Sequence, residues 1–365
     1  MRRRWKFLLL LLLLLGIAGA LGTYGVKSYL LRSQEPVKPD RLHVVEVERS
    51  ILALPHYIAM AQGFYHEQNL EVTSTVLETI DVEEEVKLKD QGDVLLGNLC
   101  QSVFTRPLGT GAELLAFAEL AHRDGTYLLG RENTEAFSWE QMKRKTILGN
   151  APDAQSNIIL EEALKQHKLV LQQQVIIIQN IPRKLKQGAF EAGVGHYVQM
   201  KEPLSIQTEL TGAGKSVAFL GAAVEPIPAL TFLAPEAYLK KHSQESQKLV
   251  NGLCKGLLWL DYHKPEEAAR VVSAYFPDLD KQILTRIIER YKKQGLWSKT
   301  PLIAEKDYEN LHTYVKRSGE LTNPVEYSDG VYAKLAKKAA KTVKYIPPEL
   351  QPKKKTWWEK LISRE

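Results

Sequence analysis

The chain has 365 residues, of which 44% are hydrophobic and 25% charged, a composition typical of a globular protein with a real core. Its formal charge of +6 comes from the two ends, because four of the first six residues are basic and ten lysines and arginines follow from Lys334 onward. The body between these ends is mildly acidic, which argues against a nucleic-acid-binding body. Cys100 and Cys254 are too few for a disulfide framework, and two buried free thiols are favoured over one bridge.

Residues 7–26 are uncharged and about long enough to span a bilayer. The basic residues before them hold the N-terminus inside, so the remainder of the chain is expected to be exported. Two alternatives stay open for this segment. It is a retained membrane anchor, or it is a signal peptide with a small-residue cleavage site at Ala18-Gly19-Ala20. We assign residues 1–32 to it and residues 33–41 to a polar linker with two prolines.

After the linker, strand and helix patterns alternate, which predicts α/β architecture with mainly parallel sheets. A strand at Leu42–Val47 leads through a loop into a helix, and Pro55 suits the first turn of that helix. A second strand is expected at Leu70–Leu77. In open parallel sheets, ligands bind where a loop leaves the carboxyl end of a strand. The backbone amides of Tyr57 and Ile58 are therefore expected to face a ligand.

The remaining elements are predicted from hydrophobic periodicity and from helix-end signals. Ser138 to Gln141 has the form of a capping box, and Asp153 is placed to cap a helix. Further strands are expected at Asp93–Gly97, Glu113–Leu120, Gly125–Arg131, Thr146–Gly149, Gln173–Gln179, Val217–Val224 and Ala229–Ala234. Further helices are expected at Asp81–Gln91, from Asn98 toward Gly109, after Asp153, and at Lys184–Ala189, Ser243–His263, Pro265–Ala274, Asp278–Gln294, Ala304–Ser318 and Ser328–Lys341.

Two familiar catalytic motifs are absent from the sequence, and a third is incomplete. Gly212 to Ser216 ends like a phosphate-binding P-loop, but Glu209 stands where the motif requires its first glycine. No GxSxG elbow and no HExxH pair occurs. His56, His122 and His196 follow or precede predicted strands and are candidates for lining a binding site, with ordinary polar residues as the alternative.

The segment Asn150–Asn157 opens a predicted helix, whose free amides and positive dipole end favour an anion. That interaction contributes about 0.3–1 kcal/mol, and up to about 2 kcal/mol when it is partly buried. Capping by Asp153 is the alternative, since its carboxylate would lie at the same positive helix end as a bound anion. At the other end of the chain, three lysines and two tryptophans in Lys353–Trp358 suit an anionic membrane surface or a solvated tail.

Several stretches match one family's sequence patterns in order and spacing: Pro55–Ala59 with Gly63–Tyr65, Gly92-Asp93, Ala189–Gly193, Glu236–His242, and Trp259 with His263–Ala269. Together they resemble the extracytoplasmic substrate-binding proteins of ABC importers, in the nitrate/sulfonate/taurine and thiamine-pyrimidine group. The resemblance covers about Leu42 to Ala339. It is loose at Gln141–Lys145, and His196-Tyr197 replaces an Asp-Ala pair of the family pattern.

The resemblance implies an α/β, two-lobe periplasmic-binding-protein type II fold with a hinge between the lobes, preceded here by the N-terminal hydrophobic helix. Residues 42–123 and 218–345 would form lobe 1, residues 124–217 lobe 2, and residues 346–365 the basic tail. The implied function is capture of a sulfonate, nitrate-like anion, pyrimidine or related molecule for an ABC permease and its ATPase. No catalysis, cofactor, metal or nucleic acid is expected, and the location is extracytoplasmic, either membrane-anchored or secreted.

Ligand contacts are expected from both lobes where they close on each other. The predicted ligand-binding residues are Pro55, His56, Tyr57, Asn98, Gln101 and His122 with Gln155, Ser156, His196 and Tyr197. Two other functions are kept as alternatives: a membrane-anchored ligand-sensing ectodomain, and an enzyme on the same two-lobe scaffold.

Overall fold

The computed structural model of the chain describes residues 38–77, 94–105, 113–131 and 137–350. The expected N-terminal hydrophobic segment, the acidic helix Asp81–Gln91, Gly92-Asp93 and the tail from residue 351 lie outside these ranges. Within them, no helix combines the length and the apolar character that a membrane span requires.

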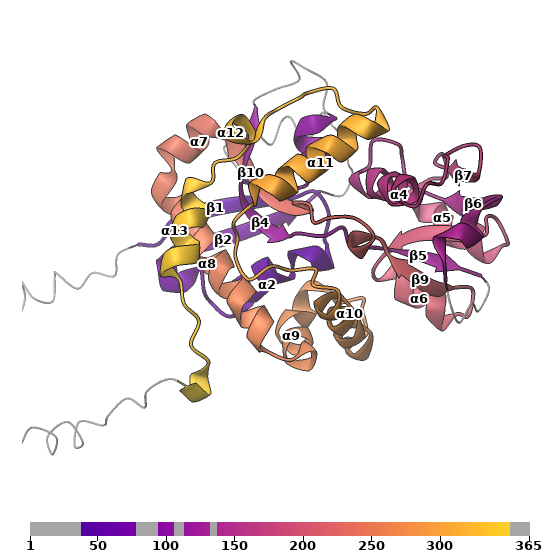
Figure 1. Cartoon of the computed structure of the whole chain (residues 1–365). Helices are drawn as coiled ribbons and strands as arrows, with labels where there is room; N and C mark the ends of the chain where they lie inside the picture. Colours follow the sequence, from indigo (N-terminus) through magenta and orange to yellow (C-terminus); the bar gives the residue numbers. More distant parts are fainter. Residues whose placement is uncertain (1–37, 78–93, 106–112, 132–136, 351–365) are drawn as a thin grey trace, which may run out of the picture. The chain divides into compact units, whose positions relative to one another are not determined.

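The strands form two separate five-stranded sheets, and these are the cores of two lobes (Figure 1). The sheet of lobe 1 has the order β2 (Leu70–Val76), β1 (Asp40–Glu46), β3 (Val94–Gly97), β10 (Leu230–Pro235), β4 (Leu114–Ala121). The sheet of lobe 2 has the order β7 (Val175–Ile178), β6 (Lys145–Leu148), β8 (Tyr197–Lys201), β5 (Thr126–Gly130), β9 (Lys215–Phe219). The predicted two-lobe α/β fold is confirmed.

In each sheet four of the five strands run in the same direction and one strand, β10 or β5, is antiparallel to them, so the prediction of mainly parallel sheets is confirmed. In lobe 1, β1 runs parallel to β2 and β3, whereas β10 is antiparallel to β3 and β4. In lobe 2, β6 runs parallel to β7 and β8, whereas β5 is antiparallel to β8 and β9. The reason is topological: β5 and β10 each follow a crossing from the other lobe and so enter their sheets from that side.

The first helix begins where the sequence predicted it. Ser50 Oγ accepts a hydrogen bond from the Leu52 amide and caps a short 3-10 helix, Ile51–Ala53. Helix α2 (Leu54–Ala61) continues from it with Pro55 in its first turn, as predicted. It packs closely on α8 (Ser243–Tyr262), because a Cβ on Gly256 would lie 2.3 Å from the Pro55 carbonyl oxygen. A larger residue than glycine would therefore separate the two helices.

Helices cover both faces of the lobe 2 sheet. Successive side chains of β8 point to opposite faces, so neighbouring residues of this strand contact different helices. Gln199 Nε2 donates to the Ser156 carbonyl oxygen on α4 at 2.6 Å, while the next residue, Met200, contacts Thr208 of α6 through its sulfur at 3.3 Å. The helices of this lobe are α4 (Gln155–Gln166), α5 (Arg183–Glu191) and α6 (Leu204–Leu210). The predicted capping box also forms, with the Ser138 amide donating to Gln141 Oε1 at 3.2 Å.

The C-terminal third is helical, as predicted, and belongs mainly to lobe 1 (Figure 1). One predicted helix, Ser328–Lys341, is divided in two. Its break lies at Val331, which bridges to Ala116 of β4, and Tyr308 crowds the backbone of Gly330 just before it. Besides α8, the helices are α7 (Glu236–Lys241), α9 (Pro265–Val272), α10 (Lys281–Lys293), α11 (Glu305–Ser318), α12 (Tyr327–Gly330) and α13 (Lys334–Thr342).

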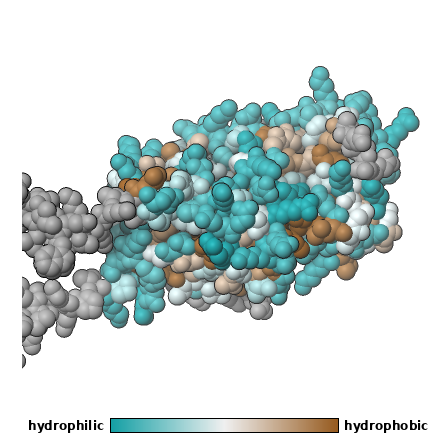
Figure 2. Space-filling view, turned by 90° about the horizontal axis from the view of Figure 1, so that it is seen from below, coloured by the Kyte–Doolittle hydropathy of each residue, from teal (hydrophilic) through white to brown (hydrophobic). Residues whose placement is uncertain are grey.

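The polarity of the surface and the state of the two cysteines are those expected from the composition. The face drawn in Figure 2 is mostly hydrophilic, and its hydrophobic residues form small separate patches. Cys100 and Cys254 are both free and buried, which confirms the prediction that they are apolar side chains and not a disulfide.

Candidate functional site

The two lobes are connected by an ion-pair cluster at the carboxyl ends of their strands. Glu48 follows β1, and its carboxylate lies 2.5 Å from Nη1 of Arg183 and 2.6 Å from Nζ of Lys201, both on lobe 2. Burial by itself raises the pKa of Glu48, but Lys201 and Arg183 outweigh it and hold the pKa at about 2. Glu48 is therefore charged at neutral pH, and it draws the two lobes together.

The amino end of α4 meets lobe 1 at the same junction. Gln155 Nε2 donates to the carbonyl oxygen of Ala229, in the segment that returns to lobe 1, at 3.1 Å. The Cys100 thiol of lobe 1 donates to the Asp153 carbonyl oxygen at 3.6 Å. The first turn of α4 thus faces the carboxyl end of β3.

No side chain caps the amino end of α4, so the predicted capping by Asp153 is wrong. The N-cap residue is Ala154, whose extended backbone (ψ 128°) places it just outside the helix, and no acidic residue lies in the first turn. The backbone of Asp153 faces lobe 1 instead, through its contact with Cys100. The amino end of α4 therefore keeps its free amides without a side-chain cap.

A buried lysine lies beside this helix end. Lys186 of α5 is 4% exposed, and its Nζ donates to the Gly149 carbonyl oxygen at 3.3 Å and to Asn150 Oδ1. Burial, with smaller contributions from Arg183 and Lys201, lowers its pKa to about 7. Among the described residues, no carboxylate forms an ion pair with it. A buried cation without a counter-ion is a position where an anion would be favoured.

Polar side chains hold this arrangement in place. Asn150 Nδ2 donates to Ser156 Oγ at 2.8 Å and to Gln199 Oε1 at 3.1 Å. Gln199 Nε2 also donates to Thr126 Oγ1 at 3.0 Å. We call Asn150, Gln155, Ser156, Lys186 and Gln199 the lobe 2 polar cluster. Its amides and the Lys186 ammonium are fixed before any ligand arrives, as a preformed binding site requires.

The predicted site residues of the α2 region lie in the core of lobe 1. His56 is 0% exposed, its Nδ1 is 2.7 Å from the Tyr65 hydroxyl, and burial lowers its pKa to about 3. The Tyr57 hydroxyl donates to the buried carboxylate of Glu46, and its ring stacks on Tyr275 at 4.9 Å. Pro55 is also buried, against α8. These three residues contact Tyr65, Glu46 and α8 within lobe 1, and no hydrogen bond or ion pair joins them to the lobe 2 polar cluster in the described part of the chain.

Asn98 and Gln101 of lobe 1 lie beside the junction. Gln101 donates its backbone amide to Asn98 Oδ1 at 2.8 Å, and Asn98 Nδ2 donates to Gln101 Oε1 at 2.9 Å. They flank Cys100, which contacts lobe 2 and begins a π-helical turn, Cys100–Phe104. The described part of the predicted helix is this single turn. Of the predicted residues, Asn98, Gln101, Gln155 and Ser156 are the four that the fold brings to one place.

The other predicted residues lie elsewhere. His122 Nε2 is 2.7 Å from the Gly295 carbonyl oxygen, at the crossing between the lobes. His196 is bonded to the Thr146 backbone at the beginning of β8, whereas Lys201, which contacts lobe 1, ends that strand. Five residues of strand separate them by roughly 16 Å. Tyr197 lies at the same far edge and packs on Gly130.

The sequence reasoning missed Glu48, Arg183, Lys186, Lys201 and Gln199. Lys186 was the hardest to find, because α5 inverts the usual preference: Leu185 is 62% exposed while its neighbour Lys186 is buried. A signal existed for Glu48, since it directly follows the first strand, where ligands bind in such sheets.

Comparisons with known proteins agree with the two-lobe fold. The model of the NMT1/THI5-like family matches residues 52–268, more than half of the chain. Over 298 residues the chain is 33% identical to YtlA of Bacillus subtilis (strain 168), which is named a binding protein; the match covers 82% of this chain and 89% of YtlA.

Two solved structures share the fold at low identity. The periplasmic aliphatic sulphonate binding protein SsuA of Escherichia coli has a TM-score of 0.64 and 12% identity, over 82% of this chain and 99% of SsuA. The desulfurization enzyme DSZB has a TM-score of 0.61 and 11% identity, over 83% of this chain and 99% of DSZB. The same scaffold thus carries a binding protein and an enzyme, and the function must be argued from the site.

Proposed function

The chain belongs to the NMT1/THI5-like family, and from this premise we propose that it is the solute-binding component of an ABC importer. It captures a small molecule between its lobes and delivers it to a membrane permease with its ATPase. The proposed ligand-binding residues are Asn98 and Gln101 of lobe 1 with the lobe 2 polar cluster.

The observation that carries this proposal is the uncompensated positive charge at the lobe junction. Lys186 is buried without a carboxylate partner among the described residues, and the adjoining end of α4 has no acidic cap. An anionic group there would accept hydrogen bonds from the Lys186 ammonium, the Ser156 hydroxyl and the first-turn amides, with Asn150 holding the first two in place. Sulfonates, nitrate-like anions and heterocycles with an acidic group fit this set of donors. The name of SsuA, an aliphatic sulphonate binding protein, points to the same ligand class.

Closure follows from contacts that only one arrangement of the lobes provides. A ligand held by lobe 2 and touched by Asn98 and Gln101 binds the closed form more tightly than the open form, and so shifts the population toward closure. Glu48 contributes to the same equilibrium through Arg183 and Lys201. The closed form is the state that we propose the permease recognises.

DSZB is the observation in favour of a second function, an enzyme on the same scaffold. The cysteine at the junction does not suit nucleophilic chemistry, because burial raises the pKa of the Cys100 thiol far above neutrality. Mass spectrometry of candidate ligands after incubation with the protein separates the two functions. Unchanged ligand mass agrees with binding, and a converted product establishes an enzyme.

We place the protein outside the cytoplasm, where importers of this kind collect their solutes, with residues 7–26 as anchor or signal. N-terminal sequencing of the protein from its native membrane fraction distinguishes the anchor, whose sequence begins near Met1, from a signal cleaved near Ala20. Affinity purification with this protein as the bait should recover the importer's permease. Recovery of a signalling protein in its place would favour the sensor function.

A thermal-shift screen tests the ligand class directly. Aliphatic sulfonates, nitrate and pyrimidines are added to the purified chain, and a ligand at about 100 times its dissociation constant should add about 2.7 kcal/mol to the free energy of unfolding. The control is Lys184→Met, which changes an exposed lysine on α5, the helix that carries Lys186. This variant should be stabilised by the same ligands as the unaltered protein. Stabilisation by uncharged analogues as strong as that by the anions would contradict an anion site.

A further inference from the structure

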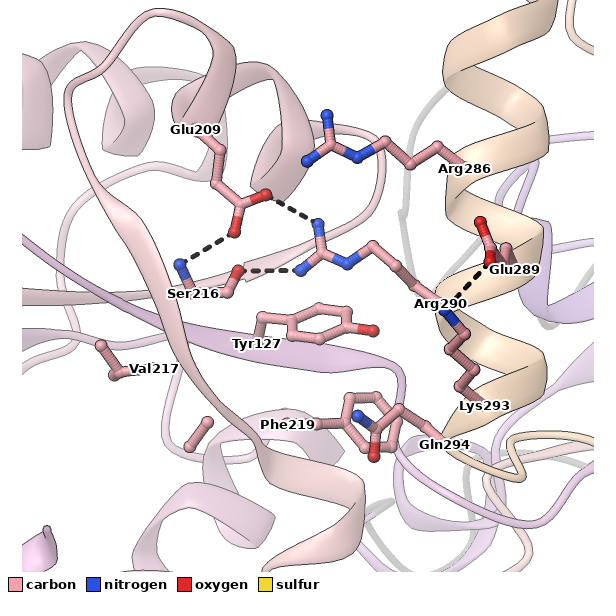
Figure 3. A pocket seen from close by; sticks show the side chains of 11 residues that line it. Tyr127, Glu209, Ser216, Val217, Phe219, Arg286, Glu289, Arg290, Lys293 and Gln294 are labelled. Atoms are coloured by element: carbon pink, nitrogen blue, oxygen red, sulfur yellow. Dashed lines mark hydrogen bonds and ion pairs between the residues drawn. The ribbon is translucent and has the colours of Figure 1, made fainter. Parts of the chain in front are cut away.

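A pocket of about 470 Å³ lies away from the proposed ligand site, between the lobe 2 sheet and α10 (Figure 3). Its volume is in the range of small-molecule sites. One wall is formed by β5, β9 and α6 of lobe 2, and the other by α10, which packs on α9. The pocket is on the α6 face of the sheet, because Tyr127 pairs with Met200, whose sulfur contacts α6. The lobe 2 polar cluster is on the opposite face, against α4.

The inner wall of this pocket is aromatic. Tyr127 of β5 and Phe219 of β9 are both buried, and their ring centroids are 5.0 Å apart. Val217 and Ala218 of the edge strand β9 continue this apolar surface. The guanidinium carbon of Arg290 lies 4.2 Å from the Tyr127 ring centroid and covers part of it. A flat apolar group would find stacking partners here.

The α10 wall presents cations at helical spacing. Arg286, Arg290 and Lys293 lie on one face of α10. Arg290 is neutralised by Glu202 at 3.0 Å and Glu209 at 2.9 Å, and Lys293 by Glu289 at 2.9 Å. None of the residues that line the pocket forms a hydrogen bond or ion pair with Arg286, whose guanidinium lies alongside that of Arg290 (Figure 3). Arg286 is attracted by the nearby Glu202, but no ion pair within the described residues uses its planar set of donors, which are therefore left for a ligand.

We propose that this pocket is a second binding site, for a small aromatic monocarboxylate. Its ring would lie against Tyr127 and Phe219, and its carboxylate would pair with Arg286, whose planar donors match a carboxylate. The site suits a single carboxylate, because Arg290 and Lys293 already use their donors on carboxylate partners and Arg286 alone among these three cations has donors to offer. It is separate from the solute site proposed above, so a molecule bound here would not compete with the transported solute.

Benzoate is the probe, and isothermal titration of the full chain is the measurement. Binding is expected in the unaltered protein, and Arg286→Gln should weaken it by about tenfold or more, since a charge-assisted pair is lost. Arg270→Gln, at another exposed arginine on α9, is the matched control and should leave benzoate affinity unchanged.

Arg183→Gln distinguishes this site from the lobe junction. It changes an exposed cation of the junction and should leave benzoate affinity unchanged. Loss of benzoate binding in Arg183→Gln but not in Arg286→Gln would place the aromatic acid at the junction and overturn the second site. Absence of benzoate binding to the unaltered chain up to about 10 mM, well above a millimolar dissociation constant, would also overturn it. Neither result alters the expected response to sulfonates, so the two proposals fail separately.

Discussion

The two sides of the lobe junction differ in how their polar groups are used. On lobe 1, Tyr57 donates to Glu46 and His56 contacts Tyr65, so both are already bonded within the core. On lobe 2, Lys186 is buried without a carboxylate partner among the described residues, and α4 begins without an acidic cap. The comparison shows that a helix of the expected sequence pattern in the expected place need not bind the ligand. In the mechanism that we propose, lobe 2 holds the ligand and lobe 1 closes over it.

Lys186→Met should have the largest effect. It removes the buried cation while nearly keeping its volume, and an anion that loses a charged hydrogen-bond partner should bind about 10- to 100-fold more weakly. Titration calorimetry with an aliphatic sulfonate measures the affinity, and Lys184→Met is the matched control. Equal sulfonate affinity in the two variants would show that the cluster is not the anion site.

Tyr57→Phe tests the lobe 1 side. It removes the hydroxyl that donates to the buried Glu46 carboxylate and should lower the free energy of unfolding by about 1–3 kcal/mol. Urea unfolding measures the change, with the half-buried Tyr332→Phe as the control. Sulfonate affinity of the folded variant should stay the same. A folded Tyr57→Phe with weakened binding would return Tyr57 to the ligand site.

The pKa of Lys186, lowered to about 7, predicts opposite pH trends for binding and stability. Above pH 7 the ligand-free protein loses the Lys186 proton, so anion affinity should fall by up to about tenfold per pH unit. The unfolded chain keeps that proton to higher pH, so the stability contributed by this group rises from about pH 7 upward. Calorimetry between pH 6 and pH 9, from about one unit below this pKa to about two units above it, follows the affinity. Glu48, with a pKa of about 2, stays charged over this range, and the Lys186→Met variant should show a flat profile.

Glu48→Gln should have the smallest effect. Its pairs with Arg183 and Lys201 are partly exposed, so solvent screening limits the loss to about 0.2–1 kcal/mol of closure energy. Because Glu48 favours the closed form that binds the ligand more tightly, its loss should lower sulfonate affinity only slightly, by about twofold. Small-angle scattering of the ligand-free variant should show a slightly larger radius. A marked fall in affinity would mean that Glu48 itself contacts the ligand.

The local patterns found most of the elements. Pro55 marked the first turn of α2, the Ser138–Gln141 pattern formed its capping box, and the C-terminal helices begin and end close to their predicted bounds. These features depend on neighbouring residues, which a sequence shows directly. The predicted site residues are spread over several places in the structure. Four of the ten predicted residues lie at the lobe junction, because strand ends indicate an edge of a sheet but not which side chains turn toward the other lobe.

The sequence by itself determined the alternation of strands and helices, the helical C-terminal third and the family, since all of these are written in short-range periodicity and spacing. The tertiary structure alone decided which strands run antiparallel, which polar groups are bonded in the core and which cation is buried. Glu48 and Arg183 are 135 residues apart in the chain, and Lys186 is buried while Leu185 beside it is exposed. The physical reason is that ion pairing and desolvation depend on distances in space, and the chain sets those distances only when both lobes are folded.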